Sequence, residues 1–170
     1  MKEPALVIIK PDGISKKLVG NILTKFAQTG LDLVALKTAK ATKRLAQEHY
    51  RHIQGTQFFE GTIKYFMGQF HRDKKLIAII YYGDKAIIKC RKIAGATNPE
   101  DADPESIRGS YGRIVHKGKY VIYENVVHVS SDKSEAIREI KLWFDPEDIT
   151  VNLYPTRTIR YQGKVKRVWK

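Results

Sequence analysis

The sequence has 170 residues, 42% of them hydrophobic, which fits one domain with an ordinary core and argues against a disordered chain. The net charge of +13 predicts an affinity for anions, whether nucleotides, nucleic acid or acidic membrane surfaces. The first four residues lack the cationic start of a signal peptide, and no apolar run approaches the length of a membrane span. Because Cys90 is the only cysteine, no internal disulfide can form, and we expect an unexported, cytoplasmic protein.

The chain opens with the pattern of a β-α-β unit. Residues 5–9 form the apolar run of a buried strand, and Pro11 and Gly13 predict a turn directly after it. Apolar residues at helical spacing over residues 18–26 predict a helix with Gly30 as its C-cap, and residues 31–38 predict a second strand.

A helical hairpin is predicted next, around residues 54–56. Thr42 is a candidate cap for the first helix. The apolar sides of the two helices consist of Leu45, Ala46, His49, Tyr50 and Ile53 in the first, and Phe58, Phe59, Ile63, Phe66, Met67 and Phe70 in the second.

The middle of the chain predicts a strand, a helix and a long loop. Residues 76–82 are rich in β-formers, Gly83 and Asp84 predict a turn and cap, and residues 86–94 predict a helix stopped by Gly95. Residues 97–112 hold two prolines and two glycines among polar residues, which is typical of a long ordered loop with a binding role.

The last part of this region places a histidine at a strand end. Residues 120–127 predict a strand that stops at His128, and residues 134–144 predict a helix carrying Glu139, with Asp132 and Glu135 as a possible capping box. A neutral imidazole attacks through one nitrogen only if its other nitrogen holds the proton, and Glu139 could accept that proton's hydrogen bond. His128 is therefore a candidate nucleophile for phosphate, although a histidine in this position is more often a hydrogen-bonded surface residue.

The order of these elements, β-α-β-α-α-β-α-β-α, predicts an α/β (α+β) fold of the ferredoxin type. Its sheet would be four-stranded, largely antiparallel and covered by helices. We assign residues 1–150 to this domain and residues 151–170 to a basic C-terminal extension of it. The extension has no acidic residue and six basic ones, namely Arg157, Arg160, Lys164, Lys166, Arg167 and Lys170. It predicts affinity for nucleic acid, or packing on a neighbouring subunit through Ile159, Tyr161, Val165, Val168 and Trp169.

Several short motifs share one order and spacing with a known family. They are Lys10-Pro11-Asp12-Gly13, Glu48-His49-Tyr50, Phe58-Phe59, Gly95-Ala96-Thr97-Asn98-Pro99, Ser106-Ile107-Arg108-Gly109, Asn125 three residues before His128, and Glu139-Ile140 with Leu142-Trp143-Phe144. Over about residues 5–150 the chain closely resembles nucleoside diphosphate kinases. The resemblance implies a ping-pong reaction, in which His128 takes the terminal phosphoryl of a nucleoside triphosphate such as ATP and passes it to a nucleoside diphosphate.

The resemblance also implies a role for each matched residue. Lys10 and Tyr50 would meet the transferred phosphoryl, and Ser130 would help to place His128 and Glu139. Mg²⁺ would arrive mostly on the nucleotide phosphates, which matches a sequence without a dense carboxylate cluster. A homo-oligomer, most simply a hexamer, is also implied.

Other matched residues would hold the nucleotide. Arg91, Thr97 and Arg108 would bind the remaining phosphates, Phe58 would stack on the base, and Asn125 would bind the sugar. On residue type alone, each of these has a commoner structural explanation, such as core packing, a solvated charge or a backbone hydrogen bond. No metal site is expected at His49, His52, His71 or His116, because none has metal-ligand spacing or an orienting partner.

The chain departs from the family pattern at a few positions. Val129 stands where the family usually has Gly or Ala after the histidine. Ser131 stands where it often has Asp after the serine, and Asp132 comes one position later. Thr62 replaces the usual aliphatic residue near the base. Residues 111–123 carry an insertion in a loop that normally shapes the base end of the pocket and subunit contacts.

Two competing functions remain open from the sequence. A ferredoxin-type sheet can also be an RNA-binding platform, which the net charge favours, but no strand shows the aromatic-rich motif that such platforms use. A catalytically inactive assembly protein would keep the fold, and the presence of His128 and Glu139 speaks against it.

Overall fold

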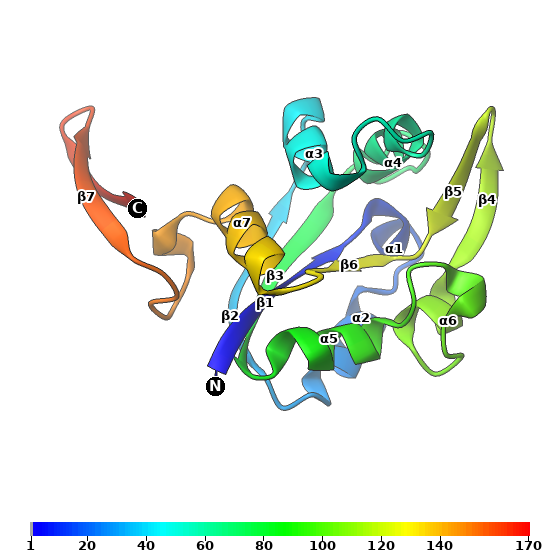
Figure 1. Cartoon of the computed structure of the whole chain (residues 1–170), viewed down its shortest axis with the longest axis horizontal. Coiled ribbons are helices and arrows are strands. Elements are labelled where there is room, and N and C mark those ends of the chain that lie inside the picture. Colours follow the sequence, from blue (N-terminus) through cyan, green and yellow to red (C-terminus); the bar gives the residue numbers. More distant parts are fainter. Residues whose placement is uncertain (1) are drawn as a thin grey trace.

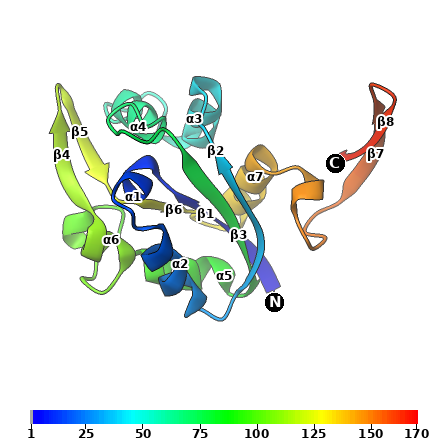
Figure 2. The ribbon, with the colours of Figure 1, turned by 180° about the vertical axis from the view of Figure 1, so that it is seen from behind.

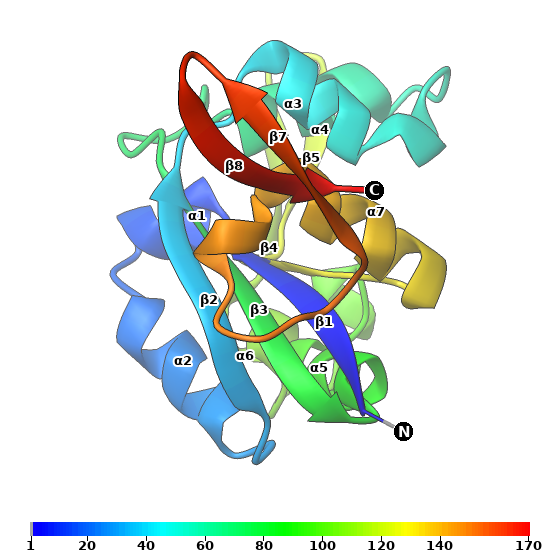
Figure 3. The same cartoon turned by 90° about the vertical axis from the view of Figure 1, so that its left-hand side faces the viewer.

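The computed structural model describes residues 2–170, apart from the side chains of Tyr161 and Lys164. At its centre lies a four-stranded sheet in the order β2 (Asp32–Ala39), β3 (Leu76–Asp84), β1 (Lys2–Ile9) and β6 (Val127–Val129). All neighbouring strands are antiparallel, and β3 lies between β2 and β1 (Figure 3). Ile8 of β1 pairs with His128 of β6. The fold class predicted from the sequence is confirmed.

Helices cover both faces of this sheet, because its central strands are apolar on both sides. Leu6 and Ile8 of β1 point into one hydrophobic cluster, and Ala5, Val7 and Ile9 point into the other. On one side lie α2 (Val19–Ala27) and α5 (Ala86–Ala94), and on the other α3 (Lys43–His49), α4 (Phe59–Phe66) and α7 (Lys133–Trp143) (Figure 1). Among the residues described, no helix is long and apolar enough to cross a membrane.

Several local predictions are confirmed by their capping geometry. The helix over residues 86–94 is present with the predicted bounds, and Gly95 ends it with φ +84°. Thr42 caps α3 by accepting a hydrogen bond from the Leu45 amide at 3.2 Å. Asp132 likewise caps α7 through the Glu135 amide at 3.0 Å. Each of these caps depends only on residues within one turn of the helix end, so the local sequence is enough to predict it.

The glycine-based predictions near three element ends are wrong. Gly13 lies inside a short helix, α1 (Pro11–Ser15), where an added Cβ would meet the Ile9 side chain at 3.0 Å, so close packing rather than a turn calls for glycine. Helix α2 ends with Gln28 as its C-cap, and Gly30 takes its positive φ of +66° in the turn that follows. Gly83 and Asp84 extend β3, and Lys85 with φ +53° precedes α5 instead.

The remaining helical segments are shorter than predicted. After α3 the chain tightens into the 3₁₀ turn η1 (Arg51–Ile53), and Phe58 is the N-cap of α4 rather than a residue within it. The long loop after Gly95 contains a second 3₁₀ turn, η2 (Pro99–Asp101), and the five-residue helix α6 (Ile107–Tyr111), which Ser106 caps through the Gly109 amide.

The single strand predicted over residues 120–127 is two strands. Val126 takes φ +54°, and this break separates β5 (Tyr120–Glu124) from β6. β5 pairs with β4 (Arg113–Lys117) in a hairpin of its own, in the part of the chain where an insertion was predicted. His128 consequently lies in the middle of a short sheet strand and not in a loop after it.

The C-terminal segment forms a second hairpin, at the end of the molecule opposite to the β4–β5 hairpin (Figure 2). After a third 3₁₀ turn, η3 (Pro146–Asp148), the strands β7 (Thr156–Tyr161) and β8 (Lys164–Trp169) pair with each other. Trp169 donates from Nε1 to the Phe144 carbonyl at 2.8 Å, and Lys166 pairs with Asp145 at 2.8 Å. The hairpin therefore rests on the end of α7 in its own chain, while the predictions for the side chains of Tyr161 and Lys164 lie outside the described part.

Candidate functional site

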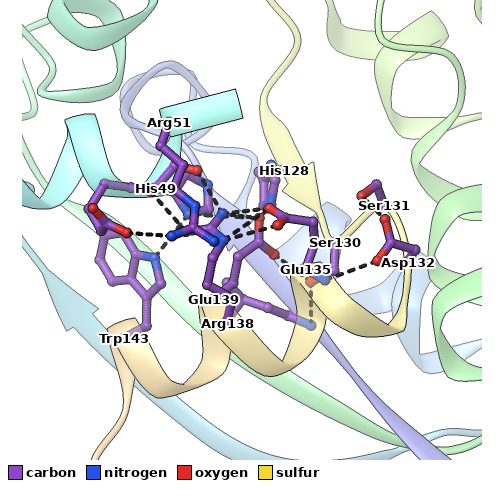
Figure 4. A network of polar contacts seen from close by, with 12 residues as sticks. His49, Arg51, His128, Ser130, Ser131, Asp132, Glu135, Arg138, Glu139 and Trp143 are labelled. Carbon is purple, nitrogen blue, oxygen red and sulfur yellow. Dashed lines mark hydrogen bonds and ion pairs between the residues drawn. The ribbon is translucent and has the colours of Figure 1, made fainter. Parts of the chain in front are cut away.

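His128 and Glu139 form the centre of the site. His128 lies on β6, and its Nε2 lies 2.8 Å from Oε1 of Glu139 on α7 (Figure 4). Glu139 is 1% exposed, and its other oxygen accepts a hydrogen bond from Ser130 Oγ at 2.5 Å. Both carboxylate oxygens are thus held, and the acceptor predicted behind His128 is present.

This contact selects the tautomer of His128. An ionised carboxylate can only accept, so Nε2 carries the proton and Nδ1 keeps its lone pair. Within residues 2–170, Nδ1 has no hydrogen-bond partner. Burial, with Lys10 and Arg108 nearby, holds the pKa of His128 well below its usual value, so the ring is neutral at physiological pH. Burial also raises the pKa of Glu139, which the neighbouring His49 and the Ser130 hydrogen bond oppose.

Lys10 stands at the end of β1, just before α1, where the strand brings it to the cavity wall. Its Nζ donates to Asn125 Oδ1 at 2.5 Å, and Asn125 Nδ2 donates to the Thr97 carbonyl at 2.8 Å. Burial, assisted by the charge of Arg108, lowers the pKa of Lys10 to about 7. The amine is therefore poised between its charged and neutral forms, and an anion placed beside it would favour the charged form.

Arg108 enters the same cavity from α6. Its Nη1 donates to the Gly95 carbonyl at 2.8 Å and its Nη2 to the Val127 carbonyl at 3.1 Å, which fixes the guanidinium against the sheet. Burial lowers its pKa to about 10, so it stays charged at neutral pH. Its Nε is buried without a partner among the described residues, as expected of a donor that awaits an anion.

The predicted residues surround two adjoining cavities. The larger, of about 410 Å³, is lined by Lys10, Tyr50, Arg91, Thr97, Arg108, Asn125, His128 and Glu139, together with His52, Val129, Ser131, Asp132 and Glu135. The smaller, of about 280 Å³, shares Lys10, Tyr50, His52, Thr97 and Asn125 with it and adds Phe58, Ile53, Thr62, Tyr65 and residues 121–123. Of the ten predicted site residues, only Ser130 lines neither cavity, since it lies behind Glu139. The sequence thus grouped residues that the fold brings together, whereas their individual roles remain predictions.

The two cavities differ in chemistry. Both contain Lys10, but Arg91, Arg108 and His128 line only the larger. The smaller is lined by Phe58, which is 54% exposed, and by Val121 and Tyr123 of the β4–β5 hairpin. Gly61 of α4 lets this hairpin approach, because an added Cβ would meet Ile122 at 3.0 Å. The β4–β5 hairpin therefore shapes the apolar end of the site.

Three polar residues at the site were missed by the sequence analysis. His49 has an orienting partner after all, since Trp143 Nε1 donates to its Nδ1 at 3.2 Å and its ring lies 4.3 Å from the ring of His128. Arg138 donates to the carbonyls of Glu48 and His49, which ties α3 to α7. Trp143 follows Glu139 by one helical turn, and this spacing was the only signal that the sequence offered.

Metal ligands are scarce at the site. The one group with suitable spacing among the described residues is His49, His128 and Glu139, whose atoms already contact one another or Trp143. Two nitrogens and one oxygen do not suit Mg²⁺, which prefers oxygen ligands. Of the carboxylates at the rim, Asp132 caps α7 and Glu135 pairs with Arg138 at 2.5 Å.

The sequence matches the family model described as nucleoside diphosphate kinase over residues 3–149. A protein named nucleoside diphosphate kinase from Pyrococcus furiosus is 40% identical over 147 residues, which cover 86% of each chain. One of the same name from Thermococcus kodakarensis is 39% identical over 147 residues, covering 86% of this chain and 79% of that one.

Solved structures agree with the sequence matches. A halophilic nucleoside diphosphate kinase from Halobacterium salinarum in complex with CDP superimposes with a TM-score of 0.78 at 30% identity, covering 89% of this chain and 93% of that one. The enzyme from Borrelia burgdorferi, described as a transition state mimic with bound vanadate and ADP, gives a TM-score of 0.76 at 30% identity, with coverages of 89% and 92%.

Proposed function

Because this chain belongs to the nucleoside diphosphate kinase family, we propose that it transfers phosphoryl groups through a phosphohistidine on Nδ1 of His128. Its reaction is that of the family, the transfer of the terminal phosphoryl of a nucleoside triphosphate to a nucleoside diphosphate. The observation that supports the assignment of His128 is the 2.8 Å contact of its Nε2 with Glu139, which leaves Nδ1 as the nucleophile.

In the first half-reaction, the lone pair of Nδ1 attacks the terminal phosphorus. The N–P bond forms as the bond to the bridging oxygen breaks, and the nucleoside diphosphate leaves with that oxygen's electrons. The imidazole ring gains positive charge, which Glu139 stabilises through the Nε2 proton. The second half-reaction reverses these steps with another nucleoside diphosphate as acceptor, so one set of residues serves both.

The cations of the larger cavity position the phosphates. Lys10 and the Tyr50 hydroxyl, which is buried without a hydrogen-bond partner among the described residues, would contact the transferred phosphoryl. Arg108 and Arg91 would bind the other phosphates. Phosphoryl transfer depends mainly on such positioning and on charge neutralisation, and the residues of the larger cavity supply both.

The nucleoside would occupy the smaller cavity. Phe58 would stack on the base, which tolerates any base because every base has a π-face. Thr97 would help to hold the phosphates, and Asn125, whose amide already links Lys10 to Thr97, would hydrogen-bond the sugar.

A nucleotide kinase of this family requires a divalent metal, and we propose Mg²⁺. The scarcity of free carboxylates at the cavity supports delivery of the ion on the nucleotide phosphates rather than by a protein cage. When bound, the ion neutralises phosphate charge, and Lys10 and Arg108 act beside it.

Assembly and location form part of the same proposal. β2 is an edge strand, and its Leu33 and Leu36 are 48% and 47% exposed, which supports a homo-oligomer, with a hexamer as the simplest expectation. The thiol of Cys90 is buried and free, in keeping with a cytoplasmic location. The RNA-platform alternative is not favoured, because helices cover both faces of the sheet. Only the basic hairpin β7–β8 keeps a proposed nonspecific affinity for nucleic acid.

Labelling with γ-³²P-ATP and Mg²⁺ tests the mechanism. The label should appear on His128 and be labile in acid but stable in base, because a phosphoramidate hydrolyses in acid. His128→Asn should lose labelling and turnover while ADP binding persists, and His116→Asn, at an exposed position on β4, should change neither. A label on serine or threonine, or turnover in the His128 variant, would contradict the assignment.

A further inference from the structure

Trp143 and His49 form a buried pair directly behind the proposed catalytic residues. The indole Nε1 donates to His49 Nδ1 at 3.2 Å, with Trp143 5% exposed and His49 fully buried (Figure 4). An indole nitrogen can only donate, so Nδ1 of His49 must be an acceptor. Burial holds the pKa of His49 well below its usual value, the ring is neutral, and its one proton lies on Nε2.

This tautomer matters because of where Nδ1 lies. It is 3.9 Å from Glu139 Oε1, the oxygen that accepts from His128 Nε2 at 2.8 Å. Oε2 of the same carboxylate is occupied by Ser130, and Arg138 Nη2 is also 3.9 Å from Oε1. A proton on Nδ1 of His49 would, after a movement of about 1 Å, become a second donor to that oxygen. It would compete with His128 for the acceptor.

His49 would not hold the observed tautomer by itself. Its Nε2, which carries the proton, is buried without a partner among the described residues. If the proton were on Nδ1 of His49 instead, this N–H would face the Glu139 carboxylate. The unprotonated Nε2 would then cost less free energy without a partner than a buried N–H does. The Trp143 hydrogen bond is the contact that opposes this exchange.

We propose that Trp143 is a positioning residue that fixes the tautomer of His49 and so reserves Glu139 Oε1 for His128. The inference rests on the proposed roles of His128 and Glu139 and adds two residues to them. Trp143, 15 residues beyond His128, thereby determines which of the two histidines donates a hydrogen bond to Glu139.

Nitrogen-15 NMR of histidine-labelled protein tests the tautomer without reference to activity. The wild-type protein should show an unprotonated Nδ1 on His49, and Trp143→Phe should shift the proton to Nδ1. A protonated Nδ1 in the wild type would overturn the proposal even if the variant did not fold. If instead wild-type His128 were not phosphorylated at all, the proposed function and not this inference would have failed.

Single-turnover phosphorylation by ATP measures the consequence. Trp143→Phe should slow phosphorylation of His128 by about tenfold, the loss typical of a disturbed supporting contact. Trp169→Phe is the matched control, because its indole also donates one hydrogen bond, at 2.8 Å, but to a backbone carbonyl that has no tautomer. That variant should keep the wild-type rate.

A double-mutant cycle separates tautomer control from packing. His49→Phe removes the competing donor, so adding Trp143→Phe in that background should slow phosphorylation no further. If Trp143→Phe costs the same factor with and without His49, the indole acts by packing alone and the proposal is wrong. An unchanged rate in the single Trp143→Phe variant would also overturn it.

Discussion

Nucleotide binding should protonate Lys10. In the free protein, burial and Arg108 lower the pKa of this amine to about 7, so at pH 8 about nine in ten molecules carry the neutral form. A bound diphosphate places negative oxygens beside Nζ and raises the pKa back toward the ordinary lysine value. Lys10 should therefore take up about 0.9 proton when ADP binds at pH 8, but only about 0.1 at pH 6, since it is then already charged.

The sign of the pH dependence follows from this shift. Because the pKa of Lys10 is higher in the complex than in the free protein, its contribution to affinity is fully developed below pH 7 and falls about tenfold per pH unit above it, until the pKa of the complex is reached. The terminal phosphate of ADP ionises near pH 6 and contributes little above pH 7.

Isothermal titration calorimetry at pH 8 in two buffers of different ionisation enthalpy measures the uptake directly. Lys10→Met should abolish it, whereas Lys92→Met, at an exposed position on α5, should leave it intact. Uptake below about 0.2 proton in the wild type would show that Lys10 is already charged in the free protein and that the reasoning from its burial fails.

Three further changes test other parts of the site. Glu139→Gln should slow phosphorylation by roughly 10–100-fold in single-turnover kinetics, less than loss of the nucleophile, because the ring loses its oriented acceptor but keeps Nδ1; an unchanged rate would make Glu139 purely structural. Gly61→Ala should push the β4–β5 hairpin from α4 and raise KM for nucleotides by up to roughly tenfold with little change in kcat, whereas Gly20→Ala, which meets no atom within 4 Å, should not. Truncation after Thr156 removes the Trp169 contact and should lower the melting temperature by roughly 2–4 °C and weaken RNA binding at low salt while turnover per folded subunit persists; unchanged melting and RNA affinity would refute both roles of the hairpin.

The sequence by itself determined the features that depend on neighbouring residues. The helix Ala86–Ala94 and its Gly95 cap, the Thr42 and Asp132 caps, and the apolar central strands follow from periodicity and capping chemistry that act within one turn or one strand. The site residues could be assembled from short motifs because their order and spacing resemble those of a known family, and all of them except Ser130 line one of the two cavities.

Only the tertiary structure decided the features that depend on distant residues. The positive φ of Val126 separates β5, which pairs with β4, from the short β6, which pairs with β1. The hydrogen bond between Lys10 and Asn125 spans 115 positions and that between Trp143 and His49 spans 94, distances over which no local pattern carries information. The lowered pKa values of Lys10 and His128 arise from burial among such partners, so the protonation states on which the chemistry depends exist only once the chain has folded.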